Sequence, residues 1–326
     1  MITLFGCTHT TLHVAKFLNN LNLKINLITI SPSTAKSNEV AGFIDLTLYK
    51  KYFSSIYVAK NYSLKSEKDE KQLKSYFKSD LGFCIGWQRL IPLKILTTFS
   101  KGIYGMHGSS RNLPFGKGRS PMNWAIIEGR KWFHTNLFRY QDGIDNGPIV
   151  DTLAFSINNS DSIETLQYKN VISMCHLLEK NLNNLLNGTI QTKKQNNKNE
   201  SFYLKRNKKD GLIDWRDDIF NIDRLIRAVS HPFYGAFTSY KKSELKIYRA
   251  NIFYTDVESH PYINAKFGQL LEVFLNKKFL VRCSGGVLLV HEYSGNLPSK
   301  NIVFKSKNSP SSKVSRNKYG FFDVEK

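Results

Sequence analysis

The first thirty residues alternate between short apolar runs and a helical pattern, and this order restricts the fold more than any other feature of the chain. The run ITLF (2–5) ends in a Gly6-Cys7-Thr8 turn, a helical pattern begins near Thr11, and a second apolar run, LKINLITI (23–30), follows. A strand, a helix and a second strand in this order form a βαβ unit, in which the two strands are parallel. The opening therefore predicts a parallel sheet.

Three more apolar runs continue this alternation, each separated from the next by a helical length: SIYVA (55–59), LGFCIG (81–86) and GIYGM (102–106). Parallel strands connected in this way need helices on both faces of the sheet. We therefore expect an α/β fold with a Rossmann-like, mostly parallel sheet. The turn at Gly6 lacks the G-x-G-x-x-G spacing that brings a pyrophosphate to a helix N-terminus, so we expect no nicotinamide or flavin cofactor.

One long helical pattern closes the first domain. It runs from Asp161 to about Asn187 and begins with the pattern Asp161-x-x-Glu164, which predicts a capping box. The polar, non-periodic stretch that follows is typical of a linker. These features predict a first domain over residues 1–187 and a linker over 188–201.

The rest of the chain predicts a small β-rich C-terminal domain over 202–294 and a basic tail over 295–326. A short helix near 222–229 is expected, and Ser284-Gly285-Gly286 predicts a hairpin turn. The tail is rich in Lys, Ser and Asn, so we expect it to be loosely ordered. The expected strands of this domain lie at 235–240, 245–251, 277–284 and 286–293.

The chain is strongly basic, with 47 Lys and Arg against 26 Asp and Glu in 326 residues and a formal net charge of +21. Such a charge suits a polyanionic partner, because neutralised phosphates release counterions. It equally suits a solvated surface, which we favour because the lysines are spread along the whole chain rather than gathered in one stripe.

Cysteine use and hydropathy indicate a reducing compartment. Cys7, Cys84, Cys175 and Cys283 are scattered without a C-x-x-C pair, which favours reduced, buried thiols and argues against a zinc knuckle. No run approaches the roughly 18 apolar residues of a membrane span, and the N-terminus lacks the pattern of a signal peptide. We therefore expect a cytoplasmic protein with no membrane span.

The segment 103–150 holds the densest cluster of residues typical of a reaction site. His107 ends a predicted strand, Leu113-Pro114-x-x-x-Gly118-x-x-Pro121 enters a helix, and Asp142-Gly143-x-Asp145-x-Gly147 forms a loop. These motifs and their spacing resemble the 10-formyltetrahydrofolate-dependent formyltransferases. The segments 205–215 and 225–237 are similar to the connector of the methionyl-tRNA and sugar N-formyltransferases. The resemblance implies that residues 1–187 form the catalytic domain and that 10-formyltetrahydrofolate donates the formyl group.

His107 and Asp145 also make chemical sense from their residue types. Formyl transfer to an amine removes a proton from that amine, and a His at the carboxyl end of a sheet strand can be the base. Asp145 would orient the imidazole and stabilise its protonated form. The alternative is that His107 only ends a strand and Asp145 only caps a turn, which leaves their joint spacing unexplained.

One position departs from the family pattern. The family has an Asn two residues before the His, where its amide supports the developing oxyanion, and here that residue is Gly105; two extra residues also follow His107. We expect the 108–112 loop to fold into the vacated volume and to supply a substitute donor. The candidates are backbone N–H groups of this loop, Ser109, Asn112 and Asn123. A relative that has lost catalysis is the alternative.

The resemblance implies two sets of binding residues. The pterin slot would be lined by the loops 84–92 and 138–143. The spacing of His9 and His13 also suits two metal ligands, but no third ligand is placed and the family uses no metal. The predicted pterin-slot residues are Trp87, Leu90, Ile91, Tyr140, Gln141 and Asp142, and the predicted substrate-binding residues are His9, Ser109, Lys205, Arg206, Arg227, His231 and Tyr234.

Two acceptors compete. Methionyl-tRNA formyltransferase carries a basic Gly-Arg-Gly insertion that enters the tRNA, whereas the corresponding residues 31–46 have one Lys, no Arg and two acidic residues. We therefore favour a nucleotide-linked amino sugar, as in O-antigen biosynthesis of lipopolysaccharide, over tRNA. A non-catalytic binding protein on the same scaffold is the third alternative, and a homodimer is left open.

Overall fold

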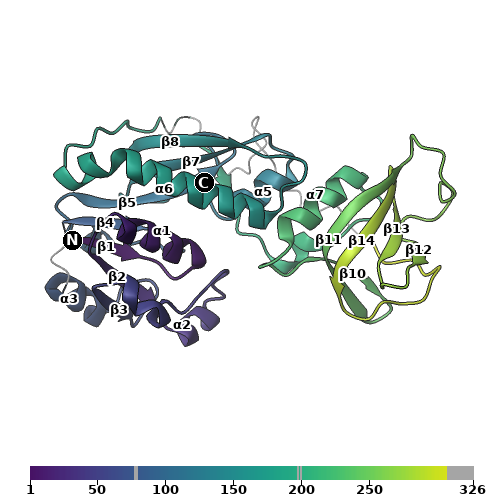
Figure 1. Ribbon diagram of the computed structural model, residues 1–326, viewed down its shortest axis with the longest axis horizontal. Helices are drawn as coiled ribbons and strands as arrows, with labels where there is room; N and C mark the ends of the chain where they lie inside the picture. Colours follow the sequence, from purple (N-terminus) through teal and green to yellow (C-terminus); the bar gives the residue numbers. More distant parts are fainter. Residues whose placement is uncertain (77–79, 197, 199, 307–326) are drawn as a thin grey trace. The chain divides into compact units, whose positions relative to one another are not determined.

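A computed structural model describes residues 1–76, 80–196, 198 and 200–306, which form two units. Unit 1 comprises residues 1–118, 132–156 and 167–202. Unit 2 comprises residues 119–131, 157–166 and the described residues from 203 onward. Each unit has its own sheet (Figure 1).

The sheet of unit 1 has seven strands in the order β3-β2-β1-β4-β5-β7-β8. The first five are parallel, and β7 and β8 are antiparallel to their neighbours. The predicted α/β class with a mostly parallel sheet is therefore confirmed. The strands are β1 (Ile2–Phe5), β2 (Ile25–Ile30), β3 (Ser55–Ala59), β4 (Leu81–Cys84), β5 (Gly102–Ser109), β7 (Trp132–Arg139) and β8 (Ile149–Ser156).

Helices bury apolar side chains on both faces of this sheet. On one face, Val14 and Leu18 of α1 (His9–Asn20) and Leu178 of α6 (Ile163–Asn187) pack in one core with Leu4 and Phe83. The opposite face packs against side chains from three other helices. These are α2 (Pro32–Ser37), α3 (Glu67–Tyr76) and α4 (Leu93–Leu96), and the 3₁₀ helix η1 (Leu46–Tyr52) follows α2.

Two glycines bring the loops after β1 and β4 into contact at the carboxyl edge of the sheet. A Cβ on Gly6 would lie 2.2 Å from the carbonyl oxygen of Ile85, and a Cβ on Gly86 would lie 2.1 Å from Oγ1 of Thr8. Gly86 also has φ +75°, which favours glycine. This close packing places His9 and Trp87 at the edge where ligands bind in open α/β sheets.

Unit 2 contains a five-stranded antiparallel sheet in the order β10-β11-β14-β13-β12. The predicted hairpin is confirmed, since Cys283 pairs with Gly286 and Gly285 has φ +83°. The strand β12 (Leu270–Val273) was not predicted, because only Leu270 and Leu271 are buried and Glu272 interrupts the apolar run. The other elements of unit 2 are α5 (Pro121–Ile127), η3 (Lys208–Gly211), α7 (Ile219–Val229), β10 (Ala236–Tyr240), β11 (Ser243–Thr255), β13 (Phe279–Cys283) and β14 (Gly286–Ser294). Two further strands have two residues each, β6 (Lys117–Gly118) in unit 1 and β9 (Phe202–Tyr203).

Two local expectations differ from the structure. The cap before α6 is made by Ser162 and Thr165, whose side chains each accept from the other's N–H, and not by Asp161 and Glu164. Residues 302–305 are not loose, because Phe304 is buried and the Lys305 N–H donates to the Ser239 carbonyl; residues 307–326 of the predicted tail lie outside the described residues.

The predicted linker is also attached to unit 1 over its described part. Lys193 and Ile149 exchange two backbone hydrogen bonds of 2.7 and 2.8 Å, and Ser201 Oγ accepts from the Gly116 N–H. A polar, non-periodic sequence cannot distinguish a free linker from a segment held by backbone hydrogen bonds.

Candidate active site

His107 lies near the end of β5 with its side chain buried, and both ring nitrogens face oxygen atoms. Nδ1 is 3.3 Å from Oδ2 of Asp145, and Nε2 is 2.7 Å from the carbonyl oxygen of Gly116. The sequence prediction that His107 and Asp145 meet therefore holds in the structure. An imidazolium formed at this position can donate to both oxygens, and the carboxylate compensates its charge.

Asp145 is fixed from two sides. It has φ +48°, an uncommon backbone conformation for a residue with a side chain. Its Oδ2 accepts from the Gly118 N–H at 3.0 Å, and the Gln195 side-chain amide donates to the carbonyls of Asp145 and Gly147, both at 2.7 Å. These bonds stabilise the strained turn and set the direction of the carboxylate towards His107.

Sequence reasoning missed Lys117, a fully buried lysine beside this turn. Its Nζ donates to Oδ1 of Asn146 at 2.6 Å and to Oε2 of Glu200 at 3.0 Å, and it lies 5.9 Å from the ring centre of Phe202. A buried ammonium is costly unless it is paired, so these contacts account for its position. The only sequence signal is a lysine between two glycines, which does not indicate burial.

The volume above Gly105 is filled by Tyr140 and not by the 108–112 loop. A Cβ on Gly105 would lie 2.1 Å from Cε1 of the Tyr140 ring, so the ring occupies the space that a side chain would need. Asn112 is exposed, and Ser109 is buried with an Oγ that lacks a hydrogen-bond partner among the described residues. The expectation that the loop folds into this volume is therefore wrong, because glycine leaves room for an aromatic ring from another strand end.

The predicted pterin loops contain both buried and exposed apolar groups. Trp87 and Ile91 are buried, and Nε1 of Trp87 has no hydrogen-bond partner within the described residues. The Leu90 side chain is 58% exposed on the same loop. Across the site, Gln141 and Asp142 are exposed, and Asp142 Oδ1 accepts from the Gly143 N–H. An exposed Leu beside an unpaired indole N–H fits a flat ring that carries acceptor atoms.

His9 is exposed at the first turn of α1, and His13 is exposed one turn later. Across the described residues, no group of three or more His, Cys, Asp or Glu side chains is arranged to hold a metal ion.

In unit 2, two of the predicted residues are used in internal contacts. The Asn123 amide donates to the Ala228 carbonyl at 2.7 Å. Arg227 donates to Asp223 at 2.8 Å and to the Asp161 carbonyl at 2.5 Å. Both side chains therefore stabilise unit 2 through α7.

The remaining predicted residues of unit 2 differ in how many of their polar groups are paired. The Arg206 guanidinium lies 5.8 Å from the Trp124 ring centre, its Nε has no partner within the described part of the chain, and burial lowers its pKa to about 10. Lys205 is exposed, His231 contacts Glu292 at 3.1 Å, and the Tyr234 hydroxyl donates to Glu244. The Arg206 guanidinium thus lies against Trp124 with its Nε unpaired in the described part of the chain, whereas Lys205 is exposed.

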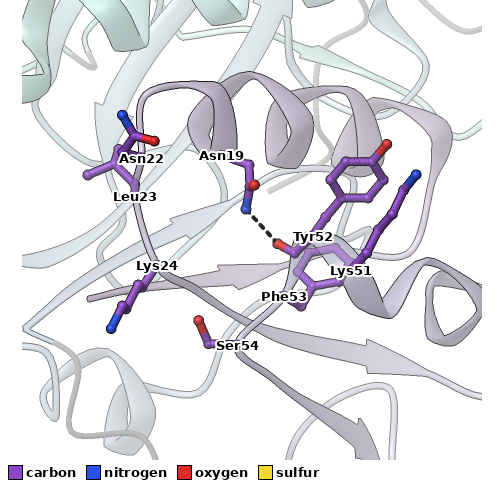
Figure 2. A pocket seen from close by; sticks show the side chains of 8 residues that line it. All are labelled: Asn19, Asn22, Leu23, Lys24, Lys51, Tyr52, Phe53 and Ser54. Carbon is purple, nitrogen blue, oxygen red and sulfur yellow. Dashed lines mark hydrogen bonds between the residues drawn. The ribbon is translucent and has the colours of Figure 1, made fainter.

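A separate pocket of about 270 Å³ lies at the opposite edge of the unit 1 sheet (Figure 2). Lys24 precedes β2 and Ser54 precedes β3, so the pocket is at the amino ends of these strands, and Asn19 donates to the Tyr52 carbonyl across it. It is therefore not part of the site at His107. The lining residues are Asn19, Asn22, Leu23, Lys24, Lys51, Tyr52, Phe53 and Ser54.

Comparison with known proteins defines the class. Residues 18–173 match the formyl transferase family, and residues 205–301 match the formyl transferase C-terminal domain. The chain belongs to the formyltransferase family, as the sequence motifs predicted.

Curated proteins with similar sequences include two differently named kinds of protein. The bifunctional polymyxin resistance protein ArnA of Wigglesworthia glossinidia brevipalpis is 32% identical over 55% of this chain and 27% of its own length. A methionyl-tRNA formyltransferase of Buchnera aphidicola subsp. Schizaphis graminum is 29% identical over 60% of this chain and 61% of its own. The chain thus spans less than two thirds of these curated relatives.

A solved structure shares the fold over most of both chains. The N-formyltransferase from Helicobacter canadensis, in complex with folinic acid and dTDP-3-aminofucose, has a TM-score of 0.61 at 18% identity, and the match covers 90% of this chain and 99% of that chain.

None of the helices in the described part of the chain combines the length and the hydropathy that a membrane span needs.

Proposed function

We propose that this protein is an N-formyltransferase that moves a formyl group from 10-formyltetrahydrofolate to the amine of a nucleotide-linked amino sugar. The observation that carries the proposal is the contact between His107 Nδ1 and Asp145 Oδ2 at the carboxyl edge of a formyltransferase sheet. A buried imidazole paired with a carboxylate is the arrangement that a general base requires.

In the proposed reaction, His107 transfers the proton and Asp145 supports the charge on its ring. The amine nitrogen forms a bond to the formyl carbon while the bond from that carbon to N10 of the folate breaks. In the tautomer that acts as the base, the ring proton of His107 is on Nδ1, facing Asp145. The free Nε2 turns from the Gly116 carbonyl to the amine, takes the proton that the amine loses, and passes it to N10. Asp145 stabilises the imidazolium between these two transfers.

The folate would lie between the two loops of the predicted pterin slot. Leu90 offers an exposed apolar side chain, and the unpaired Nε1 of Trp87 offers a donor. The Helicobacter canadensis relative, described as a complex with folinic acid, is consistent with a folate donor.

The acceptor assignment depends on residues 31–46. This segment forms the short helix α2 and returns to the sheet, where the Ile44 N–H donates to the Cys7 carbonyl at 3.1 Å and the Gln88 amide donates to the Ala41 carbonyl at 3.1 Å. A packed segment with one Lys and no Arg is not suited to bind the phosphates of an acceptor stem. Arg206, with its unused Nε, is the proposed contact for the nucleotide diphosphate.

The test is a panel of nucleotide-linked amino sugars, with tetrahydrofolate release as the readout. We expect turnover with at least one sugar, and loss of more than 10³-fold in kcat for His107→Ala and Asp145→Asn with unchanged melting temperature. Turnover in the His107→Ala variant close to that of the wild type would refute the base. No turnover with any amine would favour a non-catalytic binding protein.

Methionyl-tRNA is the second candidate acceptor. The net charge of +21 and the relatives named methionyl-tRNA formyltransferase favour it. Formylation of charged initiator tRNA by the same preparation distinguishes the two acceptors.

A further inference from the structure

The hydroxyl group of Tyr140 lies against β5, the strand that carries His107. A Cβ on Gly105 would be 2.6 Å from Cζ and 2.7 Å from Oη of Tyr140, so the tip of the phenol rests directly on β5 at this residue. Tyr140 follows β7 at once, and its N–H donates to the Ile103 carbonyl at 2.7 Å. The backbone bond and the ring contact together fix the position of the hydroxyl.

Gly105 and His107 belong to the same face of β5. Side chains two residues apart in a strand point to the same side of the sheet, and their Cα atoms are about 6.7 Å apart. The phenol above Gly105 and the imidazole of His107 are therefore neighbours along one face. Tyr104, which directly precedes Gly105, points to the opposite face, where it packs with Leu4 and Phe83.

The phenol is a neutral donor. The thiol of Cys84, which pairs with Gly105 across β4 and β5, is a nearby group. Burial, together with the nearby Cys84 and Asp145 groups, raises the pKa of Tyr140 well above its usual value, so the proton stays on the oxygen at neutral pH. Sulfur accepts hydrogen bonds weakly, and an oxyanion would be a far better acceptor.

We propose that Tyr140 is a catalytic residue whose O–H donates a hydrogen bond to the formyl oxygen as that oxygen gains negative charge. This inference rests on the proposed formyl transfer. When the amine nitrogen bonds to the formyl carbon, the electron pair of the C=O bond moves to the oxygen, and it returns when the bond to N10 breaks. Tyr140 donates to the oxyanion during this interval and keeps its proton throughout.

The proposal explains why residue 105 is glycine. Its backbone does not need glycine, since Gly105 is absent from the residues with positive φ, but any side chain there would displace the Tyr140 ring. Glycine at residue 105 therefore leaves room for the phenol ring of Tyr140.

The experiment is Tyr140→Phe, which removes only the hydroxyl and keeps the ring. Wild-type tetrahydrofolate release with the accepted amine is measured first, because its absence would refute the proposed function itself and the role of Tyr140 with it. Given turnover, we expect Tyr140→Phe to lower kcat by about 10²–10³, with KM for both substrates within about threefold. The matched control is Tyr104→Phe, which removes a buried hydroxyl from the opposite face of the same strand and should keep kcat within about twofold.

Three outcomes would overturn the role of Tyr140 while the proposed function stands. One is a Tyr140→Phe variant that retains more than a third of the wild-type kcat. Another is a loss confined to KM, which indicates folate binding and not stabilisation of the oxyanion. The third is an equal loss in Tyr104→Phe, which indicates a general effect of removing buried hydroxyls.

Discussion

Lys117 Nζ donates to Asn146 Oδ1 at 2.6 Å, one residue after the carboxylate that faces His107. The same ammonium pairs with Glu200 at 3.0 Å, so one buried side chain connects the predicted linker to the turn that carries Asp145. The position of the proposed orienting carboxylate therefore depends on a buried lysine whose ammonium binds the residue next to Asp145.

We predict that Lys117→Met lowers kcat by about 10–100-fold, because loss of the ammonium releases Asn146 and lets the Asp145 carboxylate move. It should also lower the free energy of unfolding by about 1–3 kcal/mol, since a buried hydrogen-bond partner is lost. Steady-state kinetics and urea unfolding measure the two effects. Lys194→Met, at an exposed lysine of the same segment, is the control. Unchanged kcat in Lys117→Met would show that the turn holds without the ammonium.

Gly105→Ala should destabilise the protein by about 1–3 kcal/mol, because its Cβ overlaps the Tyr140 ring. In a Tyr140→Ala background the same change should cost less than about 0.5 kcal/mol, since the ring that it meets is gone. Urea unfolding of the four proteins gives this coupling. Equal costs in both backgrounds would mean that the ring is not what excludes a side chain at residue 105.

These two relationships show where sequence reasoning stops. The parallel strands and the long helix follow from hydropathy patterns, which act over short distances in the chain. The meeting of His107 with Asp145, 38 residues apart, was expected because their motifs resemble those of a known family. The contact of Tyr140 with Gly105 joins the end of β7 to the middle of β5, 35 residues apart, and a glycine gives no signal of which ring fills its space. Lys117 is similar, since its burial depends on Glu200, 83 residues later.

Asp69 predicts a dependence of stability on pH. Burial raises its pKa, but hydrogen bonds from the Ser66 hydroxyl, the Lys60 N–H, the Tyr57 hydroxyl and the Asn61 N–H outweigh this and lower it. A depressed pKa in the folded state stabilises the protein above the unfolded value of about 3.9. This stability is lost as the pH falls through the folded pKa.

We therefore expect Asp69→Asn to lower the free energy of unfolding by about 1.5–3 kcal/mol at pH 6 and by progressively less below about pH 4. Urea unfolding from pH 3 to pH 7 measures the difference. The exposed Asp80, changed to Asn, is the control. A difference between wild type and Asp69→Asn that does not shrink on acidification would contradict the charged role of Asp69.

The acceptor can be tested through its dependence on salt. A tRNA acceptor would be held mainly by phosphate contacts, so log KM would rise with log salt with a slope approaching the number of contacts. A sugar nucleotide offers one diphosphate, so its slope should be near 1. We predict the shallow slope and no specific formylation of initiator tRNA, because residues 31–46 pack against the sheet with a single Lys and Arg206 is the proposed diphosphate contact.

The proposed diphosphate contact can be tested in the same assay. Arg206→Met should raise KM for the sugar nucleotide about tenfold and flatten the slope, whereas Arg216→Met, at an arginine paired with Asp214, should change neither. Efficient formylation of initiator tRNA with a steep slope would replace the sugar by tRNA as the acceptor.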